Sequence, residues 1–397
     1  MMNKNEWKKV KLGDVFELQI GRTPSRNNKN YWDNGSNNWI SISDIKENEK
    51  YIEKTKEKIT NLAIQDSKIK LVPKNTVIMS FKLSVGKAAI TSQDIYTNEA
   101  IVAFIPKVLN LVDNNFLYYY LQNINWKDGI NKAVKGLTLN KPLISNKIIF
   151  LPDLKIQKQI AKKLDTVFSI LNLKKQQFFE FEKLIKFQFF KMFGDPILNE
   201  KNWKKVSCKE IISKIGSGST PLGGNKNYKS KGISFIRSLN VHNNKFINDG
   251  LVFINEKQSE KLKNVNVEKD DILFNITGAS VARSCIVPLN ILPARVNQHV
   301  SIIRCNKEII KPIFLCSQLT NIQYQSFLLK IAKNNGATRE ALTKEQLENL
   351  NIILPPIELQ NKFADFVRQT EKCLFELQKS IDETQLLFDS LMDKYFS

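Results

Sequence analysis

The chain of 397 residues contains few side chains that could bind a transition metal or transfer protons. It has only two histidines, His242 and His299, and its five cysteines show no CxxC spacing. Transition-metal sites need several such ligands close together, so the sequence predicts no zinc or related centre. Two histidines also leave little for acid–base catalysis. The odd number of thiols favours reduced cysteines and a cytoplasmic location.

Long apolar runs and nucleotide-binding motifs are missing as well. No eighteen consecutive apolar residues occur and residues 1–11 are polar, so neither a membrane span nor a signal peptide is expected. The segment Ser84-Val85-Gly86-Lys87-Ala88 lacks the first glycine and the magnesium-binding hydroxyl of a phosphate loop. Leu354-Pro355-Pro356-Ile357 lacks the amide and the aromatic ring of an amino-methyltransferase site. We therefore expect a chain that is not an enzyme and binds no cofactor.

Basic side chains, by contrast, are in large excess. Lysine and arginine number 60 against 39 aspartates and glutamates, which gives a formal net charge of +21 and a pI near 9.6. An excess of this size concentrates anions at the protein surface, and nucleic acid is the usual partner. A lysine-rich and asparagine-rich composition inherited from an AT-rich genome would give the same excess without such a partner.

The sequence contains a long internal duplication. Trp7-Lys8-Lys9-Val10 returns as Trp203-Lys204-Lys205-Val206, and Thr23-Pro24 returns as Thr220-Pro221. Leu151-Pro152 returns 203 residues later as Leu354-Pro355, and Gln157 and Phe193 recur with the same offset. A repeat with so long a period indicates two copies of one structural unit in a single chain. The chain therefore presents two similar surfaces.

Short alternating runs broken by glycine and proline open each copy and are typical of strands. In the first copy we expect strands at 39–43, 77–81, 88–91 and 100–105 and a helix at 114–122. In the second copy we expect strands at 234–237, 271–275, 285–287 and 300–304. The predicted fold class is α+β, with two similar mixed domains at residues 1–152 and 197–355. Trp7, Trp39 and Trp203 are expected in the cores, and Tyr118, Tyr119 and Tyr120 are expected to pack on the domain or against a partner.

A long helix is predicted after each domain, at residues 153–196 and 356–397. Apolar residues in the two helices alternate at spacings of four and three, which is the coiled-coil period. The first seam is Ile160, Leu164, Val167, Leu171, Phe178, Phe181 and Ile185; the second is Val367, Leu374, Leu377, Ile381, Phe388 and Leu391. Equivalent positions differ by 203, and the polar Lys174 and Gln188 of the first seam correspond to Leu377 and Leu391 of the second.

The charges and lengths of these helices predict how they associate. The first helix is basic and the second acidic, so we expect an antiparallel coiled coil with pseudo-two-fold symmetry; packing of each helix on its own domain is the alternative. About 38 residues at about 1.5 Å each give a rod of about 55 Å. Two DNA-reading domains at its ends would read a bipartite site with a fixed gap. Because the domain sequences differ, the half-sites should differ too.

Several motifs together resemble one known family. They are Gly21-Arg22-Thr23-Pro24-Ser25, Trp39 to Ile45, Leu151-Pro152 with Gln157-Lys158-Gln159-Ile160, and Lys191-Met192-Phe193-Gly194-Asp195. Along its whole length the chain resembles the specificity (S) subunit of type I restriction–modification systems. The resemblance implies a non-catalytic chain that recognises double-stranded DNA and holds two adenine-methylating modification subunits. Restriction subunits would join in the full complex, and S-adenosylmethionine, ATP and Mg would be bound by these partners.

Four loops in each copy concentrate the side chains that contact bases and phosphates. In the first copy they lie at 22–29, 41–46, 82–87 and 132–140, and in the second at 219–229, 237–244, 275–283 and 333–339. Arg22, Arg237, Arg283 and Arg339 are the candidate guanine readers. The candidate DNA-binding residues are Arg22, Thr23, Ser25, Asn28, Ser43, Lys82, Ser84, Lys87, Asn98, Lys135, Thr138, Ser219, Thr220, Asn225, Arg237, Ser238, Asn240, Asn275, Thr277, Arg283, Asn297, Gln298, Asn335 and Arg339.

Three other functions are consistent with parts of this pattern. A stand-alone, two-headed DNA-binding regulator would use the same domains without a partner subunit. A self-sufficient modification and restriction enzyme would need the motifs that the sequence lacks. A purely structural coiled-coil adaptor would not require the net charge of +21 or the loops rich in Arg, Lys and Asn.

Overall fold

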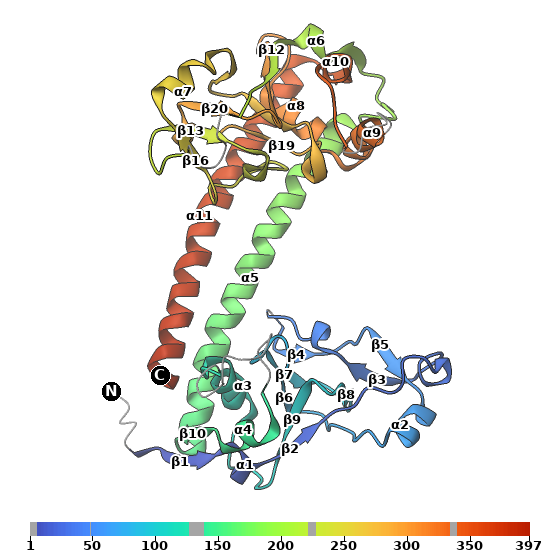
Figure 1. The fold of residues 1–397 in the computed structure, drawn as a ribbon, viewed down its shortest axis with the longest axis vertical. Coiled ribbons are helices and arrows are strands. Elements are labelled where there is room, and N and C mark those ends of the chain that lie inside the picture. Colours follow the sequence, from blue (N-terminus) through green and yellow to red (C-terminus); the bar gives the residue numbers. More distant parts are fainter. Residues whose placement is uncertain (1–5, 48, 127–138, 221–227, 334–339) are drawn as a thin grey trace. The chain divides into compact units, whose positions relative to one another are not determined.

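The computed structural model describes residues 6–47, 49–126, 139–220, 228–333 and 340–397. The chain divides into two compact units, one formed by residues 1–176 with 379–397 and the other by residues 177–378. Two forty-residue helices, α5 (Leu154–Phe193) and α11 (Ile357–Phe396), each contribute one part to both units (Figure 1). No helix in the described parts of the chain is long and apolar enough to cross a membrane.

The first unit contains a mixed domain built on two main sheets. Its five-stranded sheet has the order β2-β9-β6-β7-β4, and a three-stranded sheet has the order β5-β3-β8. A two-stranded ladder of β1 (Lys8–Lys11) and β10 (Ile148–Leu151) joins the two ends of the domain. The other strands are β2 (Phe16–Ile20), β3 (Asn37–Ile40), β4 (Tyr51–Ile52), β5 (Glu57–Ile59), β6 (Val77–Ser80), β7 (Ala88–Thr91), β8 (Tyr96–Thr97) and β9 (Ile101–Pro106). The helices are α1 (Leu12–Val15), α2 (Asn61–Ser67), α3 (Asn114–Asn123) and α4 (Lys141–Asn146).

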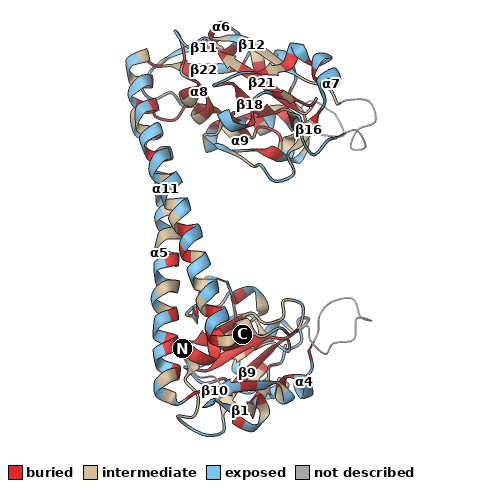
Figure 2. Ribbon diagram, turned by 90° about the vertical axis from the view of Figure 1, so that its left-hand side faces the viewer, coloured by how far each residue is buried: buried red, intermediate tan, exposed pale blue. Residues whose placement is uncertain are grey.

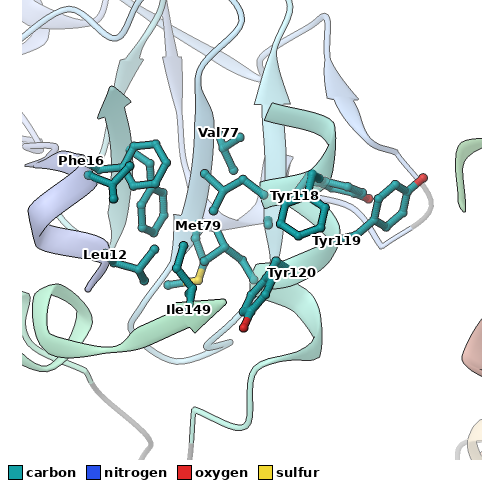
Figure 3. Close-up of a cluster of buried hydrophobic side chains, with 14 of the residues drawn as sticks. Leu12, Phe16, Val77, Met79, Tyr118, Tyr119, Tyr120 and Ile149 are labelled. Carbon is teal, nitrogen blue, oxygen red and sulfur yellow. The ribbon is translucent and has the colours of Figure 1, made fainter. Parts of the chain in front are cut away.

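The predicted strands at 77–81, 88–91 and 100–105 and the helix at 114–122 are therefore confirmed to within about one residue. Helix α3 packs its tyrosines into the core of the first unit, as Figure 3 shows for Tyr118, Tyr119 and Tyr120. Tyr119 donates a hydrogen bond to Asp165 of α5 at 2.6 Å, and the buried Lys50 forms an ion pair with the same carboxylate. These contacts fix the domain on the beginning of α5. Burial raises the pKa of Tyr118 to about 12.

The second unit repeats this arrangement. One sheet has the order β12-β21-β18-β19 and another the order β16-β13-β20-β17, and β11 (Lys204–Ser207) pairs with β22 (Asn351–Leu354). The other strands are β12 (Ile212–Ser217), β13 (Ile233–Ile236), β14 (Val241–His242), β15 (Lys245–Phe246), β16 (Val252–Ile254), β17 (Asn266–Val267), β18 (Ile272–Asn275), β19 (Ser284–Ile286), β20 (Ala294–Val296) and β21 (Val300–Cys305). The helices are α6 (Cys208–Ile211), α7 (Glu256–Glu260), α8 (Pro312–Leu319), α9 (Ile322–Lys333) and α10 (Lys344–Glu348).

The strand pairing establishes the structural equivalence of the two copies. Strand β3 pairs in parallel with β8, and β13 pairs in parallel with β20. The order β2-β9-β6-β7 in the first unit corresponds to β12-β21-β18-β19 in the second. The four strands predicted in the second copy are all present. The two copies predicted from the sequence therefore share this strand order and pairing.

A buried glutamine occupies the same position at the start of each long helix. Gln157 accepts a hydrogen bond from Asp113 N at 2.8 Å and donates to Pro152 O at 2.8 Å. Gln360, 203 residues later, accepts from the backbone N–H of Lys311 at 2.9 Å and donates to Pro355 O at 2.9 Å. A side chain that satisfies several buried main-chain groups at once holds the helix to its domain.

The residues predicted for the seam of α5 and α11 can be located on the two helices. They are buried or half-buried, whereas most other positions of the two helices are exposed (Figure 2). In the first unit Phe168 of α5 lies 6.0 Å from Phe388 of α11, measured between ring centroids. In the second unit the ring centroids of Phe189 and Phe363 lie 5.6 Å apart. A later residue of α5 thus meets an earlier residue of α11, so the helices pair antiparallel.

The polar seam position Lys174 has different neighbours from those expected. Its Nζ lies 2.7 Å from Ser380 Oγ, 3.3 Å from Ser380 O and 2.8 Å from Thr384 Oγ1. A lysine ammonium has three protons to donate, and two hydroxyls and a carbonyl can accept them. The correspondence with Leu377 was drawn from the repeat offset, but antiparallel pairing places Lys174 opposite residues 380–384 instead.

Candidate nucleic-acid interface

In the first domain, the connection between β8 and β9 (residues 98–100) brings the predicted loops together. Arg22 N donates to Thr97 O at 2.8 Å, and Asn98 N donates to Ile40 O at 3.0 Å. Phe81 N donates to Ala100 O at 2.9 Å, and Leu139 N donates to Phe81 O at 2.9 Å. The first loop therefore begins at this connection, and the residues just before the second and third loops are hydrogen-bonded to it. Leu139, in the described end of the fourth loop, is bonded to Phe81, which precedes the third loop.

The second domain has the same main-chain frame around residues 297–299. Gly218 N donates to Asn297 O at 3.1 Å, and Asn297 N donates to Ile236 O at 3.0 Å. Ile276 N donates to His299 O at 3.0 Å, and Leu342 N donates to Ile276 O at 2.9 Å. The last three of these bonds have counterparts in the first domain, whereas Gly21 N, the equivalent of Gly218 N, donates to Ile101 O at 3.2 Å. Thus Asn98 corresponds to Asn297, Glu99 to Gln298, Ala100 to His299 and Lys82 to Thr277.

A glycine is required where the first loop leaves its strand. A Cβ atom on Gly21 would lie 2.0 Å from Thr97 O, and one on Gly218 would lie 1.7 Å from Val296 O. Both distances are far shorter than any contact that a carbon atom tolerates. Two residues after each glycine comes a threonine, and its hydroxyl donates to a side chain of the connection: Thr23 to the carboxylate of Glu99, and Thr220 to the amide oxygen of Gln298.

The strand predicted at 39–43 ends earlier, and the remainder is a turn. Strand β3 stops at Ile40, and residues 42–44 form the 3₁₀ turn η3 (Ile42–Asp44). The cause is Asp44, whose carboxylate accepts from Ser41 N at 2.9 Å, from Ser41 Oγ at 2.8 Å and from Lys56 N at 3.2 Å. Ser43 lies in this turn and is exposed. The alternation of large and small residues predicts a longer strand, but the capping bonds of Asp44 turn the chain after Ile40.

The equivalent turn in the second domain, η5 (Ser238–Asn240), uses an amide in place of the acid. Asn240 Oδ1 accepts from Arg237 N at 3.0 Å, while Asn240 Nδ2 donates to Ile247 O at 2.9 Å and to Asp249 O at 3.3 Å. Phe235 and Asn240 take the places of Trp39 and Asp44 in this segment, and the strand and turn are kept.

The cationic side chains of the first domain have defined positions around this frame. Arg22 Nη1 donates to Ser67 O at 2.8 Å. Arg26 was not among the predicted site residues; its guanidinium carbon lies 3.9 Å from the ring centroid of Trp32, and it forms an ion pair with Glu57. The ammonium of Lys87 lies 3.0 Å from the carboxylate of Glu47 and lowers its pKa. The other predicted residues with described exposure are Ser25, which is exposed, and Asn28, Lys82 and Ser84, which are half-buried.

In the second domain several predicted residues line one open hollow of about 550 Å³. Its lining residues are Ser238, Leu239, Thr277, Gly278, Ala279, Ser280, Arg283, His299 and Ala341. His299 was not predicted, although it follows Gln298 directly. Its Nδ1 lies 2.6 Å from Thr277 Oγ1, and its Nε2 lies 3.2 Å from Gln298 Nε2. Thr220, Gln298, His299 and Thr277 thus form one chain of hydrogen-bonding side chains.

Three predicted asparagines are placed inside the domain. Asn240 and Asn275 have no exposed surface, and Asn297 is buried. Asn275 Nδ2 donates to Ser238 O at 2.9 Å, and Asn297 Oδ1 accepts from His299 N at 3.0 Å. As placed, these side chains support the loops and do not face solvent. Asn98 Oδ1, the counterpart of Asn297, likewise accepts from Ala100 N at 3.1 Å.

The remaining candidates are Ser219, Arg237 and five residues outside the described part of the chain. Ser219 is exposed, and Arg237 Nη2 donates to Gly250 O at 2.6 Å with its guanidinium 5.4 Å from the ring of Tyr228. Five predicted residues lie outside the described part of the chain: Lys135, Thr138, Asn225, Asn335 and Arg339. Within the described ranges, no three His, Cys, Asp or Glu side chains gather as metal ligands would.

Comparison with known proteins places the chain in a family. The family model of the type I restriction modification DNA specificity domain matches residues 4–180 and again residues 200–384. The chain is 27% identical to the type I restriction enzyme MjaIX specificity subunit of Methanocaldococcus jannaschii, over 98% of this chain and 92% of that protein. It is 31% identical to the type I restriction enzyme EcoprrI specificity subunit of Escherichia coli, over 29% of this chain and 28% of that protein.

Solved structures have the same fold. The S subunit of a type I restriction–modification system from M. genitalium matches with a TM-score of 0.61 at 15% identity, covering 100% of this chain and 98% of that one. A chain from a structural study of type I complex assembly matches with a TM-score of 0.59 at 17% identity, covering 98% and 97%. The chain therefore belongs to the family of type I restriction–modification specificity subunits.

Proposed function

We propose that the chain recognises a split, asymmetric DNA site, with one half read by each domain. The observation that supports this is the main-chain frame shared by the two domains, which holds different side chains at equivalent positions. Arg22 corresponds to Ser219, Lys82 to Thr277 and Ala100 to His299. Base edges are distinguished by the donors and acceptors presented to them. Two faces with different donors and acceptors select different half-sites.

The proposal extends to how the chain holds DNA and its partners. The net charge of +21 supplies phosphate contacts, whose strength falls steeply with salt. The chain itself is not catalytic and acts as the scaffold for two modification subunits and for the restriction subunits. S-adenosylmethionine, ATP and Mg are bound by those partners. Exposed apolar side chains on α5 and α11 offer surface for them to cover: Leu173, Phe179, Phe187, Phe375 and Leu386.

The test is a methylation map. The chain is co-expressed with its modification subunit in a host without DNA methylation, and modified adenines are located by sequencing. A single split motif with two different halves and a fixed gap is the expected result. No modification, with the modification subunit folded and bound to the chain, would contradict the proposal. It would favour a stand-alone two-headed DNA-binding regulator.

The antiparallel helices would set the length of the gap. Removing seven residues from each helix, at 174–180 and 376–382, takes about 10 Å from the pair. At about 3.4 Å per base pair, the gap should shorten by about three base pairs while both half-sites stay the same. Removing residues 174–180 alone puts the seams out of register and should abolish modification. Altered half-sites with an unchanged gap would rule out the helices as the spacer.

A further inference from the structure

One matched pair of exposed side chains lies at the centre of the two frames. Glu99 and Gln298 both follow the asparagine that the β8–β9 and β20–β21 connections share, and both are exposed. Each accepts a hydrogen bond from the threonine of the glycine-initiated loop, Thr23 or Thr220. The main chain places them equivalently, so the chemical difference between the domains at this point is a carboxylate against a carboxamide.

Their chemistry selects different bases. A carboxylate can only accept hydrogen bonds, and the major-groove group that suits it is the amino group of cytosine. A carboxamide both donates and accepts, and it matches the N6 and N7 atoms of adenine. The Thr23 hydroxyl donates to Oε2 of Glu99 and so fixes the orientation of the carboxylate. The other oxygen, Oε1, is the one that would accept from a base. In the second domain His299 Nε2, 3.2 Å from Gln298 Nε2, orients the amide in addition.

A purely structural role for Glu99 does not explain why the side chain carries a charge. Ordering the loop needs only an acceptor for the Thr23 hydroxyl, and the second domain achieves this with an uncharged amide. An exposed carboxylate beside the predicted DNA-contacting loops repels phosphates. It is favourable at a DNA interface when it accepts a hydrogen bond from a base.

We propose that residues 99 and 298 are matched specificity determinants: Glu99 selects cytosine at one position of the first half-site, and Gln298 selects adenine at one position of the second. The proposal rests on the bipartite recognition proposed above. Glu99 is not among the side chains expected from the sequence to contact DNA, because a carboxylate repels phosphates.

The test exchanges the two side chains in the full-length chain, co-expressed with its modification subunit. Glu99→Gln keeps an acceptor for Thr23 and removes only the charge, and Gln298→Glu is its reciprocal. Expected for Glu99→Gln is a change from cytosine to adenine at one position of the first half-site, with roughly 10-fold less methylation of the original sites. Gln298→Glu should change adenine to cytosine in the second half-site alone. Each variant should leave the other half-site and the gap as they are.

Two charge-matched controls accompany these variants. Glu17→Gln removes a carboxylate from β2 that pairs with Lys70 at 3.7 Å, and Gln323→Glu adds one to the exposed start of α9. Both should keep the wild-type motif. A split motif that is identical in wild type, Glu99→Gln and Gln298→Glu would overturn this inference and leave bipartite recognition intact. Absence of a split motif in the wild-type map would overturn both.

Discussion

The two recognition domains share a main-chain frame, but the side chains that face outward from this frame differ between the domains. At the β8–β9 and β20–β21 connections three backbone hydrogen bonds correspond, and both connections keep an asparagine, the half-buried Asn98 and the buried Asn297. The outward residues next to them differ in charge, as Glu99 and Gln298 do. A frame that does not depend on its outward side chains allows base recognition to change without loss of the fold.

The buried polar residues of the frame also differ, but each matches its own surroundings. Both oxygens of Asp44 face N–H or hydroxyl donors, so an acid satisfies them. Asn240 faces a donor on one side and two carbonyls on the other, so an amide is needed. The units also differ in their buried titratable groups, because the four buried cysteines lie in the second unit and the tyrosines of α3 in the first. Changes to these groups test how far the equivalence extends.

The largest expected difference between the units is in alkaline stability. Burial raises the pKa of Cys208 and Cys316 from about 9 to about 12, and it also raises the pKa of Cys285 and Cys305. The folded second unit therefore favours neutral thiols, and its stability falls as the pH rises above 9. Each thiol contributes a loss of about 1.4 kcal/mol per pH unit, or about 5 kcal/mol for four at pH 10.

The first unit should lose stability only at higher pH. Tyr118 titrates near 10 when unfolded and near 12 when folded, so its stabilisation is lost above pH 10. Lys50 acts in the opposite sense: burial lowers its pKa, so stability rises as pH approaches 10.5. Urea midpoints at pH 8 and 10 can be followed by tryptophan fluorescence, to which the first unit contributes four of the five tryptophans, and by pulsed thiol alkylation for the second unit. Cys305→Ala should weaken the pH dependence, whereas Cys373→Ala, at an exposed position, should not; equal losses in both units would contradict the assignment.

The second prediction concerns the glutamines at the start of the two long helices. Replacing Gln157 or Gln360 with Ala leaves one N–H and two carbonyls without their partner in the unit concerned. Each variant should lower the unfolding free energy of its own unit by about 4 kcal/mol. Urea unfolding measures this, with the exposed Gln159→Ala and Gln369→Ala as controls expected to change it by less than about 0.5 kcal/mol. A large loss for one glutamine only would show that the two positions are not equivalent.

The third and smallest effects come from exchanging the turn residues. Asn240→Asp turns a carboxylate toward two main-chain carbonyls at a fully buried position and should cost about 3 kcal/mol. Asp44→Asn directs one N–H group toward Lys56 N and should cost about 1 kcal/mol. Thermal unfolding of the two variants tests the order. If Asp44→Asn were the more harmful, the acid would have a role beyond the turn.

The sequence allowed the repeats, the two long helices and most strands to be predicted, because these depend on periodicity. It did not allow the neighbours of Lys174 to be predicted, since these depend on the register at which the antiparallel helices pair. The turn at residues 42–44 was missed because it is fixed by the capping bonds of Asp44, and helices α8 and α9 were not identified. His299 was not predicted, because its place beside the side chain of Gln298 depends on the fold of the β20–β21 connection. A hydrogen-bonded position beside a predicted reader is the signal that could have found it.

The central claim is that each domain reads its own half-site on a shared frame. It is tested most directly by a chain in which residues 197–355 are replaced with a second copy of residues 1–152, both long helices being kept. Co-expression with the modification subunit and methylation mapping give its target. The expected motif carries the first half-site twice, as an inverted repeat, and has lost the second half-site. A motif that still contained the original second half-site would contradict independent reading by the two domains.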